Sequence, residues 1–174
     1  MNYPSESALT CGIIAHYACC CADTLASELG ILSNQSPFLI TMPWINVPRG
    51  TNGGVTLLGL FWSALGGAFM SLGTLFLDWI SDTEITNVSV LLMFGTACGL
   101  LGSLLDSILG ATVQSTYYDE EKKQICSSGN VKSESIVHIC GYDLLSNAQV
   151  NIVSVFATTL LGGYVVGPLF YNVS

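Results

Sequence analysis

The sequence contains very little positive charge. Its 174 residues include only 4 Lys and Arg side chains against 12 Asp and Glu, so the formal net charge is −8. Proteins that bind nucleic acids neutralise the phosphate backbone with clusters of basic side chains. So few basic residues cannot form such a surface, and we therefore predict no nucleic-acid partner.

Charge of either sign is scarce. Only 9% of the residues are charged and 51% are hydrophobic, whereas roughly a quarter of residues are charged in an average soluble domain. This composition indicates an integral membrane protein whose main partner is the lipid bilayer.

Two common site patterns are also missing. None of the 7 cysteines belongs to a C-x-x-C pair. We therefore assign no zinc site and interpret the cysteines as small packing residues or sites of lipid attachment. No Walker motif occurs in the sequence, so a phosphate site in this chain would have to be built differently.

The apolar residues gather in four stretches, each of which approaches or exceeds the ~20 residues of a membrane-spanning helix. The predicted fold class is all-α, a multi-pass transmembrane helical bundle that forms one integral membrane domain over residues 1–174. We expect spans at about 8–30, 55–77, 85–105 and 150–170, and polar loops at 31–54 and 114–149.

Small side chains recur every fourth residue in two of these spans, a pattern typical of close helix contacts in lipid. The first row comprises Gly59, Ser63, Gly67 and Ser71, and the second comprises Gly95, Gly99, Ser103, Ser107 and Ala111. We predict that both rows face neighbouring helices, within the bundle or in a helix-mediated oligomer.

The polar stretch at residues 23–54 contains the first candidate site residues. Asp23 and Glu28 follow the first apolar run, with no basic residue near them. The stretch ends in a basic residue and a loop of small residues, namely Arg49, Gly50, Thr51, Asn52, Gly53 and Gly54. A glycine-rich loop can present backbone N–H groups to an anion, and the helix that follows points its positive end at the same place. Carboxylates beside an anion cradle predict a magnesium and phosphate site.

A third acidic residue, Asp106, lies beside small residues in the third span. A carboxylate at membrane depth costs ~2.5–3.5 kcal/mol on insertion scales, so it needs a partner, a proton, water or a metal ion unless it reaches solvent from a helix end. We predict Asp23, Glu28 and Asp106 as catalytic residues and magnesium ligands. On one straight helix Glu28 lies about 140° round from Asp23, whereas Ser27 shares the Asp23 face. Either the helix breaks here or the two carboxylates have separate roles.

Three strings occur in a fixed order: DTLASELG from Asp23, GTNGGVT from Gly50 and GLLGSLLDSILGATVQ from Gly99. Together they resemble the transmembrane protein 19 family, multi-pass membrane proteins whose plant relatives include a phytyl-phosphate kinase. The resemblance covers residues 19–154 and corresponds to the later part of such proteins, so we expect a partial chain. The chain departs from the family at Leu25, where the family has Trp, and at Phe38, where the family has the arginine of a Pro-Arg pair.

The resemblance adds two polar positions to the site. Asn147 and Asn151 match a family segment with paired asparagines, although Ser146 stands where an aspartate is usual. Their spacing of four residues puts both amides on one helix face. We include Ser27, Asn147 and Asn151 as further polar site residues.

The resemblance and the predicted site together imply a phosphotransferase. It would move a phosphoryl group from a nucleoside triphosphate to a polyisoprenyl phosphate with magnesium as cofactor, while Arg49 and the loop from Gly50 to Gly54 bind phosphate. The alternative is a non-catalytic membrane protein, such as a lipid or ion carrier, in which the same carboxylates only satisfy one another.

The basic residues predict the orientation in the membrane. All of them lie in the two long polar loops, Arg49 in the first and Lys122, Lys123 and Lys132 in the second. With four spans both loops fall on one side, and an excess of basic residues marks the cytosolic side. We expect an intracellular membrane such as the endoplasmic reticulum, with the site facing the nucleotides of the cytosol.

Overall fold

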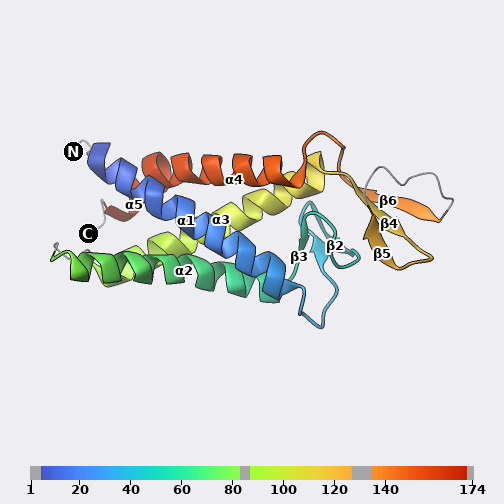
Figure 1. Ribbon diagram of the computed structural model, residues 1–174, viewed down its shortest axis with the longest axis horizontal. Helices are drawn as coiled ribbons and strands as arrows, with labels where there is room; N and C mark the ends of the chain where they lie inside the picture. Colours follow the sequence, from blue (N-terminus) through green and yellow to red (C-terminus); the bar gives the residue numbers. More distant parts are fainter. Residues whose placement is uncertain (1–4, 83–86, 127–134, 172–174) are drawn as a thin grey trace.

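The computed structural model describes residues 5–82, 87–126 and 135–171, most of which form a bundle of long helices that alternate in direction (Figure 1). The helices are α1 Ser5–Gly30, α2 Leu57–Ile80, α3 Val88–Val113 and α4 Asn147–Leu161, the last of which continues through the π-helical turn η2 Gly162–Val166 into α5 Gly167–Tyr171. The first three, and α4 taken together with η2 and α5, are each long and apolar enough to cross a membrane. The prediction of a multi-pass helical bundle is therefore confirmed.

Two helix boundaries differ from the expected ones. α3 extends to Val113, past the uncharged span expected to end near residue 105, so Asp106 lies within the helix, while the expected start at residue 85 lies outside the described residues. α4 begins at Asn147, earlier than expected, because Ser146 and Gln149 cap its first turn through reciprocal hydrogen bonds between side chain and backbone. Serine caps a helix about as well as aspartate, so Ser146 preserves this helix start.

Each polar loop contains a small antiparallel sheet that the all-α prediction did not include. The first sheet joins β1 Phe38–Leu39, β2 Met42–Asn46 and β3 Gly54–Val55 in the order β2-β1-β3. The second joins β4 Thr116–Asp119, β5 Gln124–Cys126 and β6 Ile136–Cys140 in the order β5-β4-β6. Such short strands contain too few residues to show the alternation of apolar and polar side chains that predicts a strand from sequence. Both sheets lie at the end of the bundle opposite the chain termini (Figure 1).

The two rows of small residues form the closest helix contacts. A Cβ atom on Gly99 of α3 would lie only 2.9 Å from the Cα of Gly67 on α2 and 3.0 Å from the Cβ of Ala22 on α1. Three helices therefore meet where there is no room for a side chain. Ser63 and Ser103 join the same two rows by a hydrogen bond of 3.0 Å between their hydroxyl oxygens. The predicted packing within the bundle is confirmed, and a helix-mediated oligomer stays a prediction.

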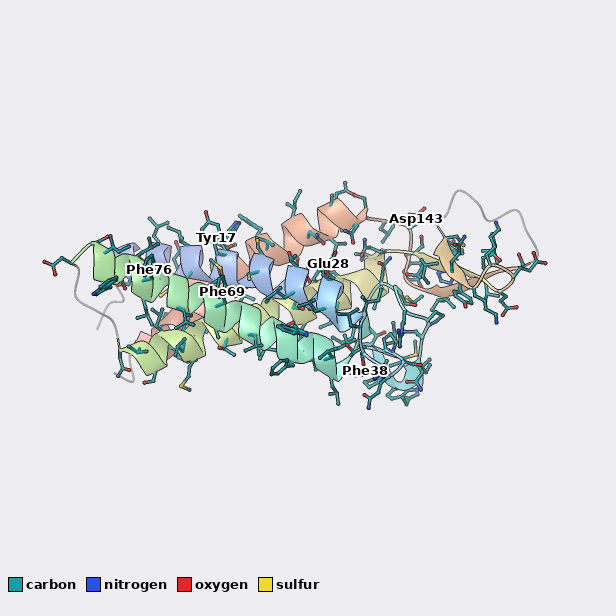
Figure 2. All side chains as sticks on the ribbon, turned by 60° about the horizontal axis from the view of Figure 1, so that its bottom comes forward. Tyr17, Glu28, Phe38, Phe69, Phe76 and Asp143 are labelled. Carbon is teal, nitrogen blue, oxygen red and sulfur yellow. The ribbon has the colours of Figure 1, made fainter. Side chains whose placement is uncertain are left out.

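Apolar side chains fill the half of the bundle away from the sheets and also cover its outside. The buried cluster in that half comprises Cys11, Ile14, Ala15, Ala18, Leu91, Phe94 and Cys98. Exposed aromatic residues such as Tyr17, Phe69 and Phe76 lie along the helices, where Figure 2 shows them away from the sheets. Because a bilayer solvates apolar side chains, this exposed surface is the one expected for a membrane protein.

The two sheets are fixed to the end of α3. A second buried cluster joins them to that helix through Leu39, Val47, Ala111 and Cys140. The Asn52 N–H donates a hydrogen bond of 3.2 Å to Thr116 Oγ1, and the Cys140 thiol donates to the Asn52 carbonyl oxygen over 3.5 Å. These contacts hold the glycine-rich loop between the second sheet and the bundle, which sets its position relative to the rest of the site.

Candidate functional site

A polar cavity of about 270 Å³ lies at the sheet end of the bundle, bounded by α1, α2, α3, α4 and the glycine-rich loop. Its wall includes every candidate site residue except Glu28: Asp23 and Ser27 from α1, Arg49 and Gly50, Thr51, Asn52, Gly53 and Gly54 from the loop, Asp106 from α3, and Asn147 and Asn151 from α4. Residues from distant parts of the sequence thus share one cavity.

Asp106 is held by two neutral donors from α4. Ser154 Oγ donates a hydrogen bond of 2.8 Å to Asp106 Oδ2. The side-chain amide of Asn151, oriented so that its nitrogen is the donor, reaches the same oxygen over 3.1 Å. Within the described ranges no basic side chain forms an ion pair with Asp106. The two neutral hydrogen bonds therefore offset part of the cost of placing this carboxylate among helices.

A chain of amide groups continues from Asp106 along the cavity wall. The Asn151 amide also donates to the carbonyl oxygen of Asn147 over 3.1 Å. Gln114, which is buried at the end of α3, donates from Nε2 to Asn147 Oδ1 over 3.5 Å. Side chains from α3 and α4 therefore form one connected polar network, and these contacts orient the Asp106 carboxylate relative to the cavity.

Asp23 lines the same cavity from α1 without a fixed partner. Its side chain is partly buried, and in the described part of the chain it forms neither a hydrogen bond nor an ion pair. The neighbouring Ser27 donates its hydroxyl to the Thr24 carbonyl oxygen of the same helix over 3.1 Å. Two acidic side chains, one bonded and one not, therefore share a cavity. Such a pair is stabilised by a proton or a cation placed between the two carboxylates.

Glu28 does not belong to this group. It is exposed, it does not line the cavity, and Figure 2 shows it on the outer side of α1. α1 stays helical as far as Gly30. The Glu28 side chain therefore leaves the helix about 140° around its axis from the Asp23 side chain. The described residues contain no group of three or more His, Cys, Asp and Glu side chains that could hold a metal ion. The predicted set of three carboxylates is therefore not assembled, and Asp23 and Asp106 remain.

Arg49 supplies positive charge at the cavity wall. One terminal nitrogen of its guanidinium donates a hydrogen bond of 2.6 Å to the carbonyl oxygen of Ser33, a buried residue. This bond fixes the direction of the side chain and uses one of the five N–H donors of a guanidinium. The remaining donors can bind an anion in the cavity.

The glycine-rich loop has the backbone shape that a phosphate loop needs but fewer available donors than its sequence indicates. Gly50 and Gly53 have φ angles of +85° and +74°, which favour glycine. The N–H groups of Thr51, Asn52 and Gly54 are already hydrogen-bonded within the protein. Among the described residues, Gly50 and Gly53 are the loop positions whose N–H groups have no such partner. At most two of the five loop N–H groups therefore remain for an anion.

The N-terminus of α2 also opens on the cavity. Thr56 caps the helix by accepting a hydrogen bond of 3.0 Å from the Gly59 N–H, and its hydroxyl donates to the Gly30 carbonyl oxygen over 3.2 Å. Thr56 and Gly59 both line the cavity. The positive end of the helix dipole and the Arg49 guanidinium therefore favour a negatively charged ligand at this wall.

Gln114 and Ser154 are functional candidates that the sequence reasoning missed. Gln114 is the last residue of the string GLLGSLLDSILGATVQ. Ser154 follows Asn151 by three residues and so lies on the same face of α4. Both signals were present in the sequence, but neither residue is charged, and only the packing of α4 against α3 brings Ser154 to Asp106 and Gln114 to Asn147.

The chain matches the family described as Integral membrane protein DUF92 over residues 1–159. Because this match covers most of the chain, the protein belongs to that family. No solved structure matches the chain.

Two relatives are similar to the chain over most of its length. Protein PGR of Arabidopsis thaliana is 39% identical over 160 residues, which cover 89% of this chain and 54% of that protein. An uncharacterized membrane protein of Methanocaldococcus jannaschii is 32% identical over 160 residues, which cover 92% of this chain and 50% of that protein. The chain therefore spans about half the length of the relatives it matches.

Proposed function

We propose that the polar cavity binds phosphate groups at the membrane surface and serves the transfer of a phosphoryl group to a lipid phosphate. The reaction would move the terminal phosphoryl group of a nucleoside triphosphate to an oxygen of an isoprenoid monophosphate, giving a nucleoside diphosphate and an isoprenoid diphosphate. The observation that carries the proposal is that Asp23 and Asp106, from different helices, line one cavity together with Arg49.

The residues of the cavity fit a magnesium ion bound together with phosphate. Mg²⁺ in phosphoryl-transfer sites is usually held by one or two carboxylates, with water and substrate phosphates as the other ligands. Asp23 and Asp106 would be the two carboxylates, and the amide oxygens of Asn147 and Asn151 are further oxygen atoms on the same wall. When bound, the ion would neutralise charge on the phosphate oxygens.

The chain's own groups would position the reactants. Phosphoryl transfer needs alignment and charge neutralisation more than a strong base. Arg49 and the N–H groups of Gly50 and Gly53 would bind phosphate oxygens, and the N-terminus of α2 adds to the positive potential. Ser154 and Asn151 would hold Asp106 in a fixed direction through their hydrogen bonds to Oδ2.

The proposed orientation places the cavity on the cytosolic side of an intracellular membrane such as the endoplasmic reticulum. Arg49, Lys122 and Lys123 all lie at the sheet end of the bundle, while Lys132 falls outside the described residues. An excess of basic residues in short loops is typical of the cytosolic side. The two phosphate-bearing substrates would then meet at the membrane surface, where the lipid arrives from the bilayer and the nucleotide arrives from solution.

The sequence resemblance supports the same activity. The strings that begin at Asp23, Gly50 and Gly99 all contribute residues to the cavity wall. We propose on this basis that the protein is related to the transmembrane protein 19 family and to phytyl-phosphate kinase. Because the chain spans about half of its relatives, the activity of a whole protein of this kind remains part of the proposal.

A binding and turnover experiment tests the proposal. The purified chain in lipid nanodiscs would be titrated with a nucleoside triphosphate at several magnesium concentrations, and then assayed for conversion of a long-chain isoprenyl monophosphate to the diphosphate. Asp23→Asn is expected to remove the magnesium-dependent binding, whereas Glu28→Gln, a matched change outside the cavity, is expected to leave it intact. Equal binding by wild type and Asp23→Asn would contradict the proposed site.

A non-catalytic role is the second candidate function, and a specific observation favours it. The Asp106 carboxylate is already bonded to two neutral donors, and three of the five loop N–H groups are used internally. A lipid or ion carrier needs only a polar cavity with reversible binding. Under this alternative the nanodisc experiment would give saturable binding of the monophosphate without formation of diphosphate.

A further inference from the structure

A second cavity, of about 290 Å³, lies between α3 and the segment formed by α4 and η2. We call it the α3–α4 groove. Its wall is largely apolar and includes Leu101, Leu104, Leu105, Ile108, Leu161 and Val166. Leu101 and Leu161 are 48% and 44% exposed, so the groove opens on the outer surface of the bundle that faces lipid.

The α3–α4 groove adjoins the polar cavity. Leu104 lines both of them. On α4, Asn151 lines the polar cavity and Thr158 lines the groove, with Ser154 between them. The spacings of three and four residues place all three on one helix face. Along this face the wall changes from amides to apolar groups as the helix runs away from the sheets.

The groove offers no hydrogen bond to a ligand. Its most polar member, Thr158, is buried and donates its hydroxyl to the Ser154 carbonyl oxygen of its own helix over 2.8 Å. The rest of the wall consists of aliphatic side chains, Gly162 and the buried Cys98. Such a surface suits a hydrocarbon chain and gives no site to a headgroup.

The π-helical turn η2 forms one end of the groove. Gly162 and Val166, the first and last residues of this turn, both line it. Single π-helical turns inside α-helices widen the helix locally and are frequent at functional sites. Gly162 lets this turn pack closely on α1, because a Cβ at this position would meet Ala15, and the turn thereby closes one end of the groove beside α3.

We propose that the α3–α4 groove binds the hydrocarbon chain of the same lipid monophosphate whose phosphate enters the polar cavity. This inference rests on the proposed function of that cavity and adds to it the residues that select the lipid. The phosphate would lie near Asp106, and the chain would pass Leu104 and follow Thr158 towards η2. Because the groove is open to the bilayer, a long-chain lipid can enter sideways without leaving the membrane.

Photo-crosslinking in nanodiscs tests the position of the chain. The probe is a long-chain isoprenyl monophosphate that carries a diazirine near the end of its chain, and the control probe is the corresponding alcohol without phosphate. We expect the monophosphate to label peptides that contain residues 98–108 and 158–166, and unlabelled monophosphate to compete. The alcohol is expected to label lipid-facing residues all round the bundle without competition.

Two pairs of variants test the groove itself. Leu161→Trp fills the groove, whereas Leu160→Trp changes a neighbouring leucine of nearly equal exposure, 45% against 44%, that lies outside it. Leu101→Trp with Met93→Trp as its control repeats the comparison on α3. Because a tryptophan ring would occupy the space proposed for the hydrocarbon chain, the groove variants are expected to lower labelling of the two peptides by roughly tenfold. The controls are expected to label like wild type.

The outcomes separate this inference from the proposed function. Saturable, phosphate-dependent labelling on α1 or α2 would overturn the groove assignment and leave the phosphate site standing. Full labelling in both groove variants, or uniform labelling without competition, would show that bulk lipid fills the groove and would also overturn it. If no labelling depends on phosphate and Asp23→Asn changes nothing, the proposed function fails and the groove assignment fails with it.

Discussion

Ser154 on α4 donates a hydrogen bond of 2.8 Å to the carboxylate of Asp106 on α3. This bond joins two helices at the level where the polar cavity meets the apolar groove. It also fixes one oxygen of the only acidic side chain within the described part of α3. The stability of the helix bundle and the orientation of the Asp106 side chain therefore both depend on this hydrogen bond.

We expect Ser154→Ala to lower the free energy of unfolding by ~0.5–2 kcal/mol, since hydrogen bonds between membrane helices contribute about 0.6 kcal/mol on average and up to about 1.7. Thr112→Ala is the control, because the Thr112 hydroxyl bonds only to carbonyl oxygens of its own helix. Thermal unfolding in detergent measures both. Equal stability of the two variants would show that the Ser154 contact does not join the helices.

Gly67→Ala should destabilise the bundle. A Cβ at this position would lie 2.9 Å from the carbonyl carbon of Gly95 and 3.0 Å from the Cα of Thr96, both backbone atoms of α3. Overpacking of this kind costs about 1–3 kcal/mol. Gly73→Ala on the same helix is the matched control, because its Cβ would meet nothing within 4 Å. A lowered melting temperature for Gly73→Ala alone would contradict the packing described for α2 and α3.

Gly53→Ala and Gly50→Ala should differ even though both glycines have positive φ. A Cβ at Gly53 would lie 2.5 Å from the Ser107 carbonyl oxygen, whereas a Cβ at Gly50 would meet only the Ile125 side chain at 3.4 Å. We expect Gly53→Ala to reduce the yield of folded protein and Gly50→Ala to cost about 1 kcal/mol from backbone strain alone. Size-exclusion profiles and thermal unfolding distinguish them. Equal behaviour would mean that the loop does not pack on α3.

Asp119 predicts a loss of stability in acid. Hydrogen bonds from the backbone N–H groups of Lys122 and then Glu121 hold the pKa of the Asp119 carboxyl below its usual range. Because the pKa is lower in the folded state, its contribution is present above the unfolded pKa of about 3.9 and is lost as pH falls through the folded value. Asp119→Asn should remove this pH dependence, measured as protection of the β4–β5 turn from proteolysis between neutral pH and pH ~3. Glu120→Gln, a change at a neighbouring exposed carboxylate, is the control, and a similar effect of both would contradict the assignment.

Cysteine labelling tests the membrane orientation. Cys126 on β5 is partly exposed, whereas burial raises the pKa of the buried Cys140 thiol, and a hydrogen bond from Thr116 offsets this only in part. A raised pKa leaves less thiolate and slows reaction with maleimides. In cells, an impermeant maleimide should modify Cys126 first, and only once the plasma membrane has been opened to the cytosol. Labelling of Cys126 from the lumenal or outer face of an intact membrane would reverse the orientation proposed for the cavity.

The helical spans and their contact faces were predictable because both depend on patterns among residues that are close in sequence. A bilayer does not hydrogen-bond the backbone, so each span must be a long apolar helix, and such a run is visible in composition alone. Close helix contacts need small residues at a spacing of four, and the rows through Gly67 and Gly99 have that spacing. The end of the third helix was harder to predict from the sequence, because Asp106 interrupts the uncharged run but not the helix.

The candidate residues could be named from the sequence, but their grouping could not. Glu28 and Asp23 were equally plausible ligands as long as a break in the helix remained open, and only the unbroken α1 turns Glu28 away from the cavity. The short strands of the two sheets could not be predicted, although Thr116 of β4 accepts a hydrogen bond from the Asn52 N–H and the sheets pack the glycine-rich loop against α3.

The sequence by itself determined that the chain is a membrane protein, where its spans lie, and which few polar side chains could take part in chemistry. Polar groups are costly within the hydrocarbon region of a bilayer, so those that occur there usually have a function. The tertiary structure alone decided that Asp23 and Asp106 share one cavity, that Ser154 holds Asp106, and that an apolar groove lies next to the polar cavity. These relationships depend on how helices distant in sequence pack against one another, and no local pattern of residues encodes that geometry.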